Sequence, residues 1–60
     1  MAYSLYDRVN DDLGGKLPAL LRRRRRSGVS FRLIAIELSN KGPDVHRQTV
    51  WLWCRNLGIE

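Results

Sequence analysis

Hydrophobic residues recur along this chain at the spacing of one face of an α-helix. The pattern is clearest in the C-terminal half, where two sets of apolar positions follow i, i+3, i+4, i+7 spacing. These sets are Phe31, Ile34, Ala35, Leu38 and Val50, Trp53, Cys54, Leu57. No segment alternates apolar and polar residues with the period of two that is typical of a β-strand. The pattern therefore predicts an all-α fold.

Capping and helix-breaking residues predict two helices in the N-terminal half. Ser4 can cap a helix over residues 4–13, which the glycine pair at 14–15 ends. Pro18 suits the first turn of a second helix, because its missing N–H leaves no helical hydrogen bond unmade there. This helix continues through five arginines, and the Ser-Gly pair at 27–28 ends it.

Two further helices are predicted in the C-terminal half. Ser30 is the expected cap of a third helix, which runs from residue 31 to about residue 40. A Gly-Pro pair then breaks the chain. A fourth helix is expected from about residue 45 to about residue 57, with a glycine as its stop. Its cap is either Asp44 or His46, and both alternatives stay open.

Two sets of apolar residues lie outside these main faces. Leu5, Val9 and Leu13 form a stripe on the first helix at i, i+4, i+8 spacing. Leu33 and Ile36 lie away from the main apolar face of the third helix, and a helix that is apolar nearly all round is normally covered on more than one side. We expect either the first helix or a partner subunit to cover them. The stripe therefore serves either a homodimer or the core of the monomer.

Size and charge narrow the class of protein. Sixty residues make a single domain, expected over 1–60, and favour a binding module over an enzyme. The net charge of +5 and the pI near 10.4 indicate an anionic partner, most often nucleic acid. One cysteine and one histidine predict no disulfide, no metal site, no catalytic residues and no cofactor. No apolar segment approaches the roughly 20 residues of a membrane span, so no membrane association is expected.

The chemistry of a nucleic-acid site is present on two of the predicted helices. Five consecutive arginines, Arg22–Arg26, point in several directions on a helix, and Arg24 falls on the apolar stripe with its stem over the core. The others can bind phosphate through the planar guanidinium fork. On the outer face of the fourth helix, Gln48 and Arg55 are suited to hydrogen-bond adenine and guanine edges. Trp51 lies between them, where it either contacts DNA or packs on protein.

Several short motifs follow one another between residues 17 and 59. They are Arg22–Arg26, Gly28-Val29-Ser30, Ile34-Ala35-Ile36-Glu37-Leu38, Val45-His46-Arg47-Gln48-Thr49-Val50 and Trp53. Together they resemble the helix-turn-helix DNA-binding domains of small bacterial and phage regulators and of resolvase/invertase-type recombinases. The connection over 39–44 is longer than the 3–4 residues that usually join such helices.

The resemblance implies a three-helix helix-turn-helix core over 17–59 with an additional N-terminal helix over 4–13. It implies sequence-specific binding of double-stranded DNA by a small phage or bacterial transcriptional regulator, such as a repressor, in the bacterial cytoplasm at the nucleoid. The residues expected to contact bases are Arg47, Gln48, Thr49, Trp51 and Arg55. The residues expected to contact phosphates are Arg22, Arg23, Arg25, Arg26, Ser30, Arg32, Lys41 and His46. No small-molecule substrate is expected.

A second interpretation comes from a different class of protein. The chain could instead be an interaction module that binds an acidic surface of a host or phage protein, with Trp51 and Leu52 as anchors. A recombination accessory role on the same fold and RNA binding through the arginine-rich helix are further alternatives. Salt dependence and competition with random duplex DNA separate the DNA-binding interpretation from the interaction module.

Overall fold

A computed structural model of the chain describes residues 4–59 and is entirely helical over that range, with no strand. The four helices are α1 (Leu5–Asp12), α2 (Leu17–Arg26), α3 (Phe31–Lys41) and α4 (Arg47–Asn56). They form a body of 33 × 22 × 20 Å. The predicted all-α class is thus confirmed. No helix in the described part is long and apolar enough to cross a membrane.

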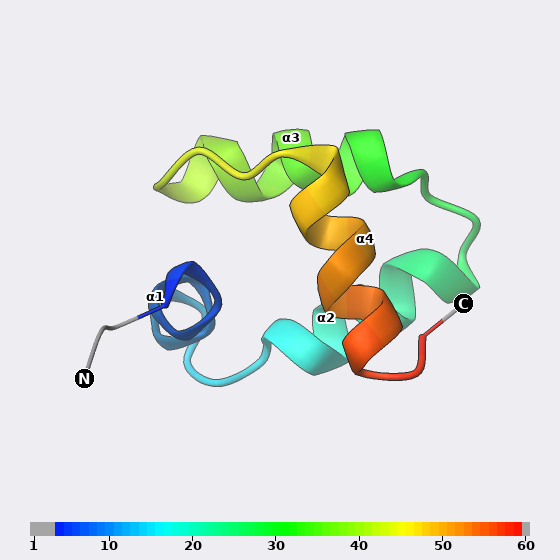
Figure 1. Cartoon of the computed structure of the whole chain (residues 1–60), viewed down its shortest axis with the longest axis horizontal. Helices are drawn as coiled ribbons and strands as arrows, with labels where there is room; N and C mark the ends of the chain where they lie inside the picture. Colours follow the sequence, from blue (N-terminus) through cyan, green and yellow to red (C-terminus); the bar gives the residue numbers. More distant parts are fainter. Residues whose placement is uncertain (1–3, 60) are drawn as a thin grey trace.

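The helices are arranged so that α4 is in contact with α3 and exposed on one side (Figure 1). The connection after α3 doubles back beside that helix, and α4 then runs across the molecule towards α2. α3 and α4 share the most extensive contact, whereas α2 joins α1 to α3 through smaller ones. This arrangement leaves α1 at one end of the molecule, away from the arginines of α2.

The core consists of ten side chains contributed by all four helices and the loop before α4. They are Val9, Leu17, Leu20, Leu21, Ile34, Ala35, Leu38, Val45, Val50 and Cys54. The helical spacing correctly predicts Ile34, Ala35 and Leu38 on α3 and Val50 and Cys54 on α4. Phe31, Trp53 and Leu57 of the same predicted sets are only half-buried and pack against this core. Trp53 packs its ring edge-on against Tyr6 of α1, with 5.4 Å between ring centroids. A pair at the rim of the core therefore joins α4 to α1.

The predicted caps and stops explain where the helices begin and end. The Ser4 and Ser30 hydroxyls accept hydrogen bonds from the N–H groups of Asp7 and Leu33, at 3.1 and 3.2 Å. Gly28 adopts a φ of +81° after α2, and Gly58 a φ of +73° after α4. The left-handed backbone of each glycine lets the following residue donate back to the helix. These bonds run from the N–H of Val29 to the Arg24 carbonyl, at 3.0 Å, and from the N–H of Ile59 to the Cys54 carbonyl, at 2.8 Å.

The start of α4 corrects the sequence prediction. The helix begins at Arg47 and not at Val45, because Val45 is held in the core by Ser39 of α3. The Ser39 hydroxyl accepts from the Val45 N–H at 2.9 Å and donates to the Val45 carbonyl at 3.2 Å. His46 is the cap, and its Nδ1 accepts the N–H of Gln48 at 3.1 Å. The choice between Asp44 and His46 is thus decided in favour of His46.

The exposed apolar residues of α3 exclude one of the two covers expected for them. Leu33 and Ile36 are 56% and 45% exposed, so α1 does not cover them. On α1, Val9 is buried in the core of the monomer, Leu13 packs against that core, and Leu5 stays 36% exposed. The stripe on α1 therefore takes part in the monomer core through Val9 and Leu13, whereas the expected homodimer stays a prediction. The Asn10 Oδ1 accepts the N–H of Leu17 at 3.1 Å, and this hydrogen bond holds α1 against the start of α2.

Candidate nucleic-acid interface

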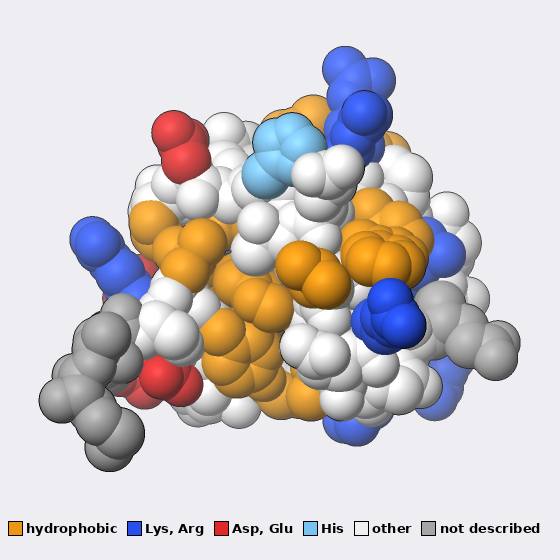
Figure 2. Space-filling view, viewed as in Figure 1, with side chains coloured by type: hydrophobic (Ala, Val, Ile, Leu, Met, Phe, Trp, Pro, Cys, Tyr) orange, Lys and Arg blue, Asp and Glu red, His pale blue; other side chains and the backbone are white. Residues whose placement is uncertain are grey.

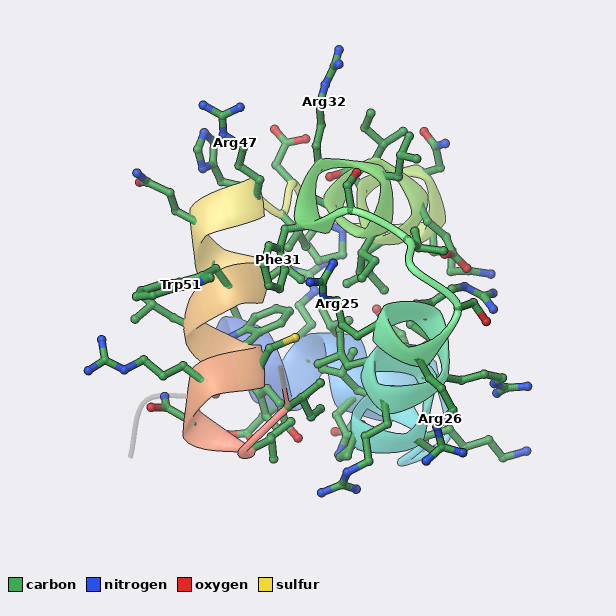
Figure 3. All side chains as sticks on the ribbon, turned by 90° about the vertical axis from the view of Figure 1, so that its right-hand side faces the viewer. Arg25, Arg26, Phe31, Arg32, Arg47 and Trp51 are labelled. Atoms are coloured by element: carbon green, nitrogen blue, oxygen red, sulfur yellow. The ribbon has the colours of Figure 1, made fainter. Side chains whose placement is uncertain are left out.

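The outer face of α4 carries most of the residues predicted to contact bases. Arg47, Gln48, Trp51 and Arg55 are exposed, whereas Thr49 is half-buried. Trp51 is 44% exposed and projects away from the helix bundle, so it does not pack on α1 (Figure 3). The guanidinium of Arg55 lies over the Trp51 ring, 5.4 Å from its centroid. The two side chains thus form one planar and cationic surface on α4.

A groove between α3 and the start of α4 brings three of the predicted phosphate-binding and base-contacting residues together. It has a volume of about 540 Å³, and Arg32, His46 and Arg47 line it. Arg32 and Arg47 both project from the same end of the molecule (Figure 3). Because the His46 Nδ1 accepts the cap hydrogen bond, the ring N–H lies at Nε2, where it can donate to an anion. The groove therefore combines three donors with the positive end of the α4 dipole.

The arginines of α2 have three different environments. Arg22, Arg23 and Arg26 are exposed, as expected for side chains that reach phosphate. Arg25 is half-buried, and its guanidinium lies 4.0 Å from the centroid of the Phe31 ring of α3. It also donates to the Val29 carbonyl at 2.7 Å. Contacts within the protein therefore orient the head group of Arg25, and its expected phosphate contact stays a prediction.

Arg24 forms an ion pair that the sequence prediction did not include. Its Nε and Nη2 donate to the two carboxylate oxygens of Glu37, at 3.0 and 2.9 Å. The side chains remain 35% and 29% exposed, so the guanidinium head is only partly shielded from water. These hydrogen bonds lower the pKa of the Glu37 carboxyl and raise the pKa of Arg24. The pair connects α2 to α3 and neutralises the acidic residue of α3.

This ion pair predicts one component of the pH dependence of stability. The pKa of Glu37 is lower in the folded protein than in the unfolded chain, so the pair stabilises the fold above the unfolded pKa. The contribution is lost as pH falls through the folded pKa. We expect Glu37→Gln to flatten the fall in unfolding free energy as pH drops below the ordinary glutamate pKa of about 4.5, by a small amount because water screens the pair.

Urea unfolding at a series of pH values measures this effect. Asp11→Asn is the matched control, because Asp11 is an exposed carboxylate on α1. If Glu37→Gln left the fall of the unfolding free energy at acid pH unchanged, the ion pair would not contribute to it. An equal flattening by Asp11→Asn would also contradict a specific role for the Arg24–Glu37 pair.

The charges of the molecule are separated between its two ends. In the view of Figure 2, acidic side chains lie in the left half, whereas most basic side chains lie in the right half. No carboxylate belongs to α2 or α4, and α3 carries only the ion-paired Glu37. The remaining acids of the described residues lie on α1 and in the loop after α3. We call the exposed faces of α2, α4 and the start of α3 the basic surface; its exposed arginines are Arg22, Arg23, Arg26, Arg32, Arg47 and Arg55.

Two further residues that were predicted to contact phosphate, Lys41 and Ser30, are not among the exposed arginines of the basic surface. Lys41 lines a hollow with Asp12 and Pro43 on the α1 side of the molecule, away from the α2 arginines. Ser30 is exposed, and its hydroxyl accepts the cap hydrogen bond of α3. Leu52, which was expected only as an anchor of the alternative interaction module, is 48% exposed on α4. The sequence predicts this exposure, because Leu52 lies four residues after Gln48 and therefore on the same outer face of α4.

The remaining reactive groups of the described residues include one buried free thiol, Cys54. Burial raises the pKa of the Cys54 thiol, which Arg25 partly offsets, so the thiol is held in its protonated form. No group of three or more potential metal ligands occurs among residues 4–59. No family model, curated protein or solved structure matches the chain.

Proposed function

We propose that this chain binds double-stranded DNA through α3 and α4 as a helix-turn-helix, and that it acts as a small phage or bacterial transcriptional regulator. In this proposal, α4 enters the major groove and presents Gln48 and Arg55 to base edges. Arg32 and Arg47 at one end of α4, and the exposed arginines of α2 beyond its other end, hold phosphates. A length of 10 residues gives α4 about 15 Å, comparable with the major groove width of roughly 12 Å.

One observation supports the proposal most strongly, namely that the basic surface contains six exposed arginines and no exposed carboxylate among the described residues. A solvated helix surface without a partner normally mixes both signs of charge. Here the acids of the described residues lie on α1 and in the loop before α4, apart from Glu37 of α3, which is paired with Arg24. Such separation favours association with a polyanion along one side of the molecule and disfavours it along the other.

The proposal predicts that duplex DNA binding depends steeply on salt. If about five arginines neutralise phosphates, log affinity falls with log salt at a slope near −4.5, which is roughly a 500-fold loss between 50 and 200 mM salt. Fluorescence anisotropy of a labelled duplex at several salt concentrations measures the slope. Arg47→Ala should reduce its magnitude by about 1.

Arg8→Ala is the matched control for this experiment. It removes the same charge from an exposed position, but Arg8 lies on α1 among the acidic residues. We expect Arg8→Ala to leave the slope nearly unchanged. A flat salt titration of the wild-type protein, or equal effects of Arg8→Ala and Arg47→Ala, would exclude the proposed use of the basic surface.

A second candidate function is favoured by the exposed apolar residues of α4. Trp51 and Leu52 are 44% and 48% exposed, and such residues are common anchors in protein–protein interfaces. In this alternative, α4 binds an acidic surface of another protein, with the arginines around it pairing carboxylates. Random duplex DNA would then fail to displace the protein from its partner, whereas it competes for a DNA-binding surface.

A further inference from the structure

Another hollow is formed by the end of α2, the start of α3, and α4 with the residues that follow it. It is an open hollow of about 440 Å³, and its lining comes from Arg25, Phe31, Trp51, Arg55, Gly58 and Ile59. Two of these side chains are aromatic rings and two are guanidinium groups. A glycine contributes only backbone at the remaining wall, so the hollow stays open towards solvent on that side. This composition is typical of sites for planar anionic ligands.

Each guanidinium in the hollow is placed by an aromatic ring. Arg25 lies over Phe31 at 4.0 Å, and Arg55 lies over Trp51 at 5.4 Å, with distances measured to the ring centroids. In Figure 3, Phe31 lies beside Arg25, whereas Trp51 projects outward from α4. Trp51 remains 44% exposed, so part of its ring is open to a ligand. A planar group can therefore stack on the indole beside a fixed positive charge.

The hollow continues into a second one that is suited to a phosphate. The adjoining hollow has a volume of about 400 Å³ and shares Arg25, Gly58 and Ile59 with the first. Arg22 and Arg26 complete its lining. Among the residues that the structure describes, no carboxylate lines either hollow. An aromatic compartment thus adjoins a cationic compartment, and one short ligand can occupy both.

We propose that these two hollows bind one nucleotide unit, with its unstacked base against Trp51 and its phosphate between Arg22, Arg25 and Arg26. Base stacking on an aromatic ring and a guanidinium fork on a phosphate are the two interactions that nucleotides offer together. The unit comes either from a free nucleoside monophosphate or from an unpaired position in a nucleic-acid strand. Neither source requires α4 to bind duplex DNA, so this site can be tested independently of the proposed function.

Titration with adenosine 5′-monophosphate, followed by NMR of the two indole N–H resonances, tests the site on the whole chain. Saturable movement of the Trp51 resonance is expected at a dissociation constant on the order of millimolar, with little movement of Trp53, which packs on Tyr6. Adenosine and inorganic phosphate alone should each bind more weakly. Trp51→Ala should weaken binding roughly 5- to 150-fold, and Arg26→Ala should weaken it in the same direction.

Matched variants and a second ligand complete the test. Arg23→Ala should leave binding unchanged, because Arg23 is exposed on α2 but lines neither hollow. Gln48→Ala should also leave it unchanged while altering duplex preference. A short single-stranded oligonucleotide that binds at least tenfold more tightly than the monophosphate identifies the strand as the source, and equal affinity identifies the free nucleotide. Absence of saturable movement with both ligands, equal binding of phosphate alone, or equal losses in Arg23→Ala and Arg26→Ala would overturn the proposal.

Discussion

Leu38→Ala should lower the free energy of unfolding by about 2–5 kcal/mol, because it leaves a cavity in a closely packed core. Leu38 is 1% exposed on α3, where this helix packs against α4. A domain of this size has a total stability of roughly 3–9 kcal/mol, so the variant should retain only part of its folded population at room temperature. Urea denaturation followed by far-UV circular dichroism measures the loss.

Leu33→Ala is the matched control for this prediction. It removes the same side-chain atoms from the same helix, but Leu33 is 56% exposed. We expect its effect to stay within about 0.5 kcal/mol. A loss in Leu33→Ala as large as that in Leu38→Ala would mean that the exposed face of α3 is covered in solution, and a second copy of the chain would then have to be sought by sedimentation.

The helices were predictable because their ends depend on residues that are close in sequence. Ser30 caps α3 through the N–H of Leu33, three residues away, and Gly28 ends α2 through bonds that span no more than five residues. Such short-range interactions depend on residues that are neighbours in the sequence, so the sequence shows them directly. The apolar spacing on α3 and α4 then places their buried faces, which is why Ile34, Ala35, Leu38, Val50 and Cys54 were predicted correctly.

The start of α4 and the state of the arginines required the tertiary structure. The Ser39 hydroxyl of α3 bonds to the backbone of Val45 and keeps this residue out of α4. Helical spacing of apolar residues does not predict such a hydrogen bond. Arg24 reaches Glu37, and Arg25 reaches the Phe31 ring, only after α2 and α3 have packed together. Five identical residues in a row therefore divide into an ion pair, a ring contact and three exposed cations, which no local pattern distinguishes.

The same limit applies to the candidate site. The outward residues of α4 were predictable from helical periodicity, because Gln48 and Arg55 differ by two turns and share one face. The hollow beside them was not, because its lining comes from the ends of three helices that the sequence separates by up to 34 positions, from Arg25 to Ile59. Phe31 was assigned to the core by its spacing, although in the structure its ring supports Arg25.

Gln48→Ala and Arg55→Ala should each relax the preference for particular base pairs and cost about 1–3 kcal/mol on the best duplex site. Both side chains are exposed on α4, and each can make two hydrogen bonds to one base edge in the major groove. Selection of binding sites from a random duplex pool, with wild type and both variants, measures the change as lost information at defined positions.

Arg23→Ala provides the contrast that makes this result interpretable. Arg23 is an exposed cation on α2, and in the proposed function it contacts phosphate, which is the same for every sequence. Its removal should weaken all duplexes by a similar factor and reduce the salt slope by about 1, while the selected sequence stays unchanged. If wild type, Gln48→Ala and Arg55→Ala select identical sequences, α4 does not read bases. The basic surface would then hold the duplex only through its phosphates, and a regulator that must find one site could not rely on this chain alone.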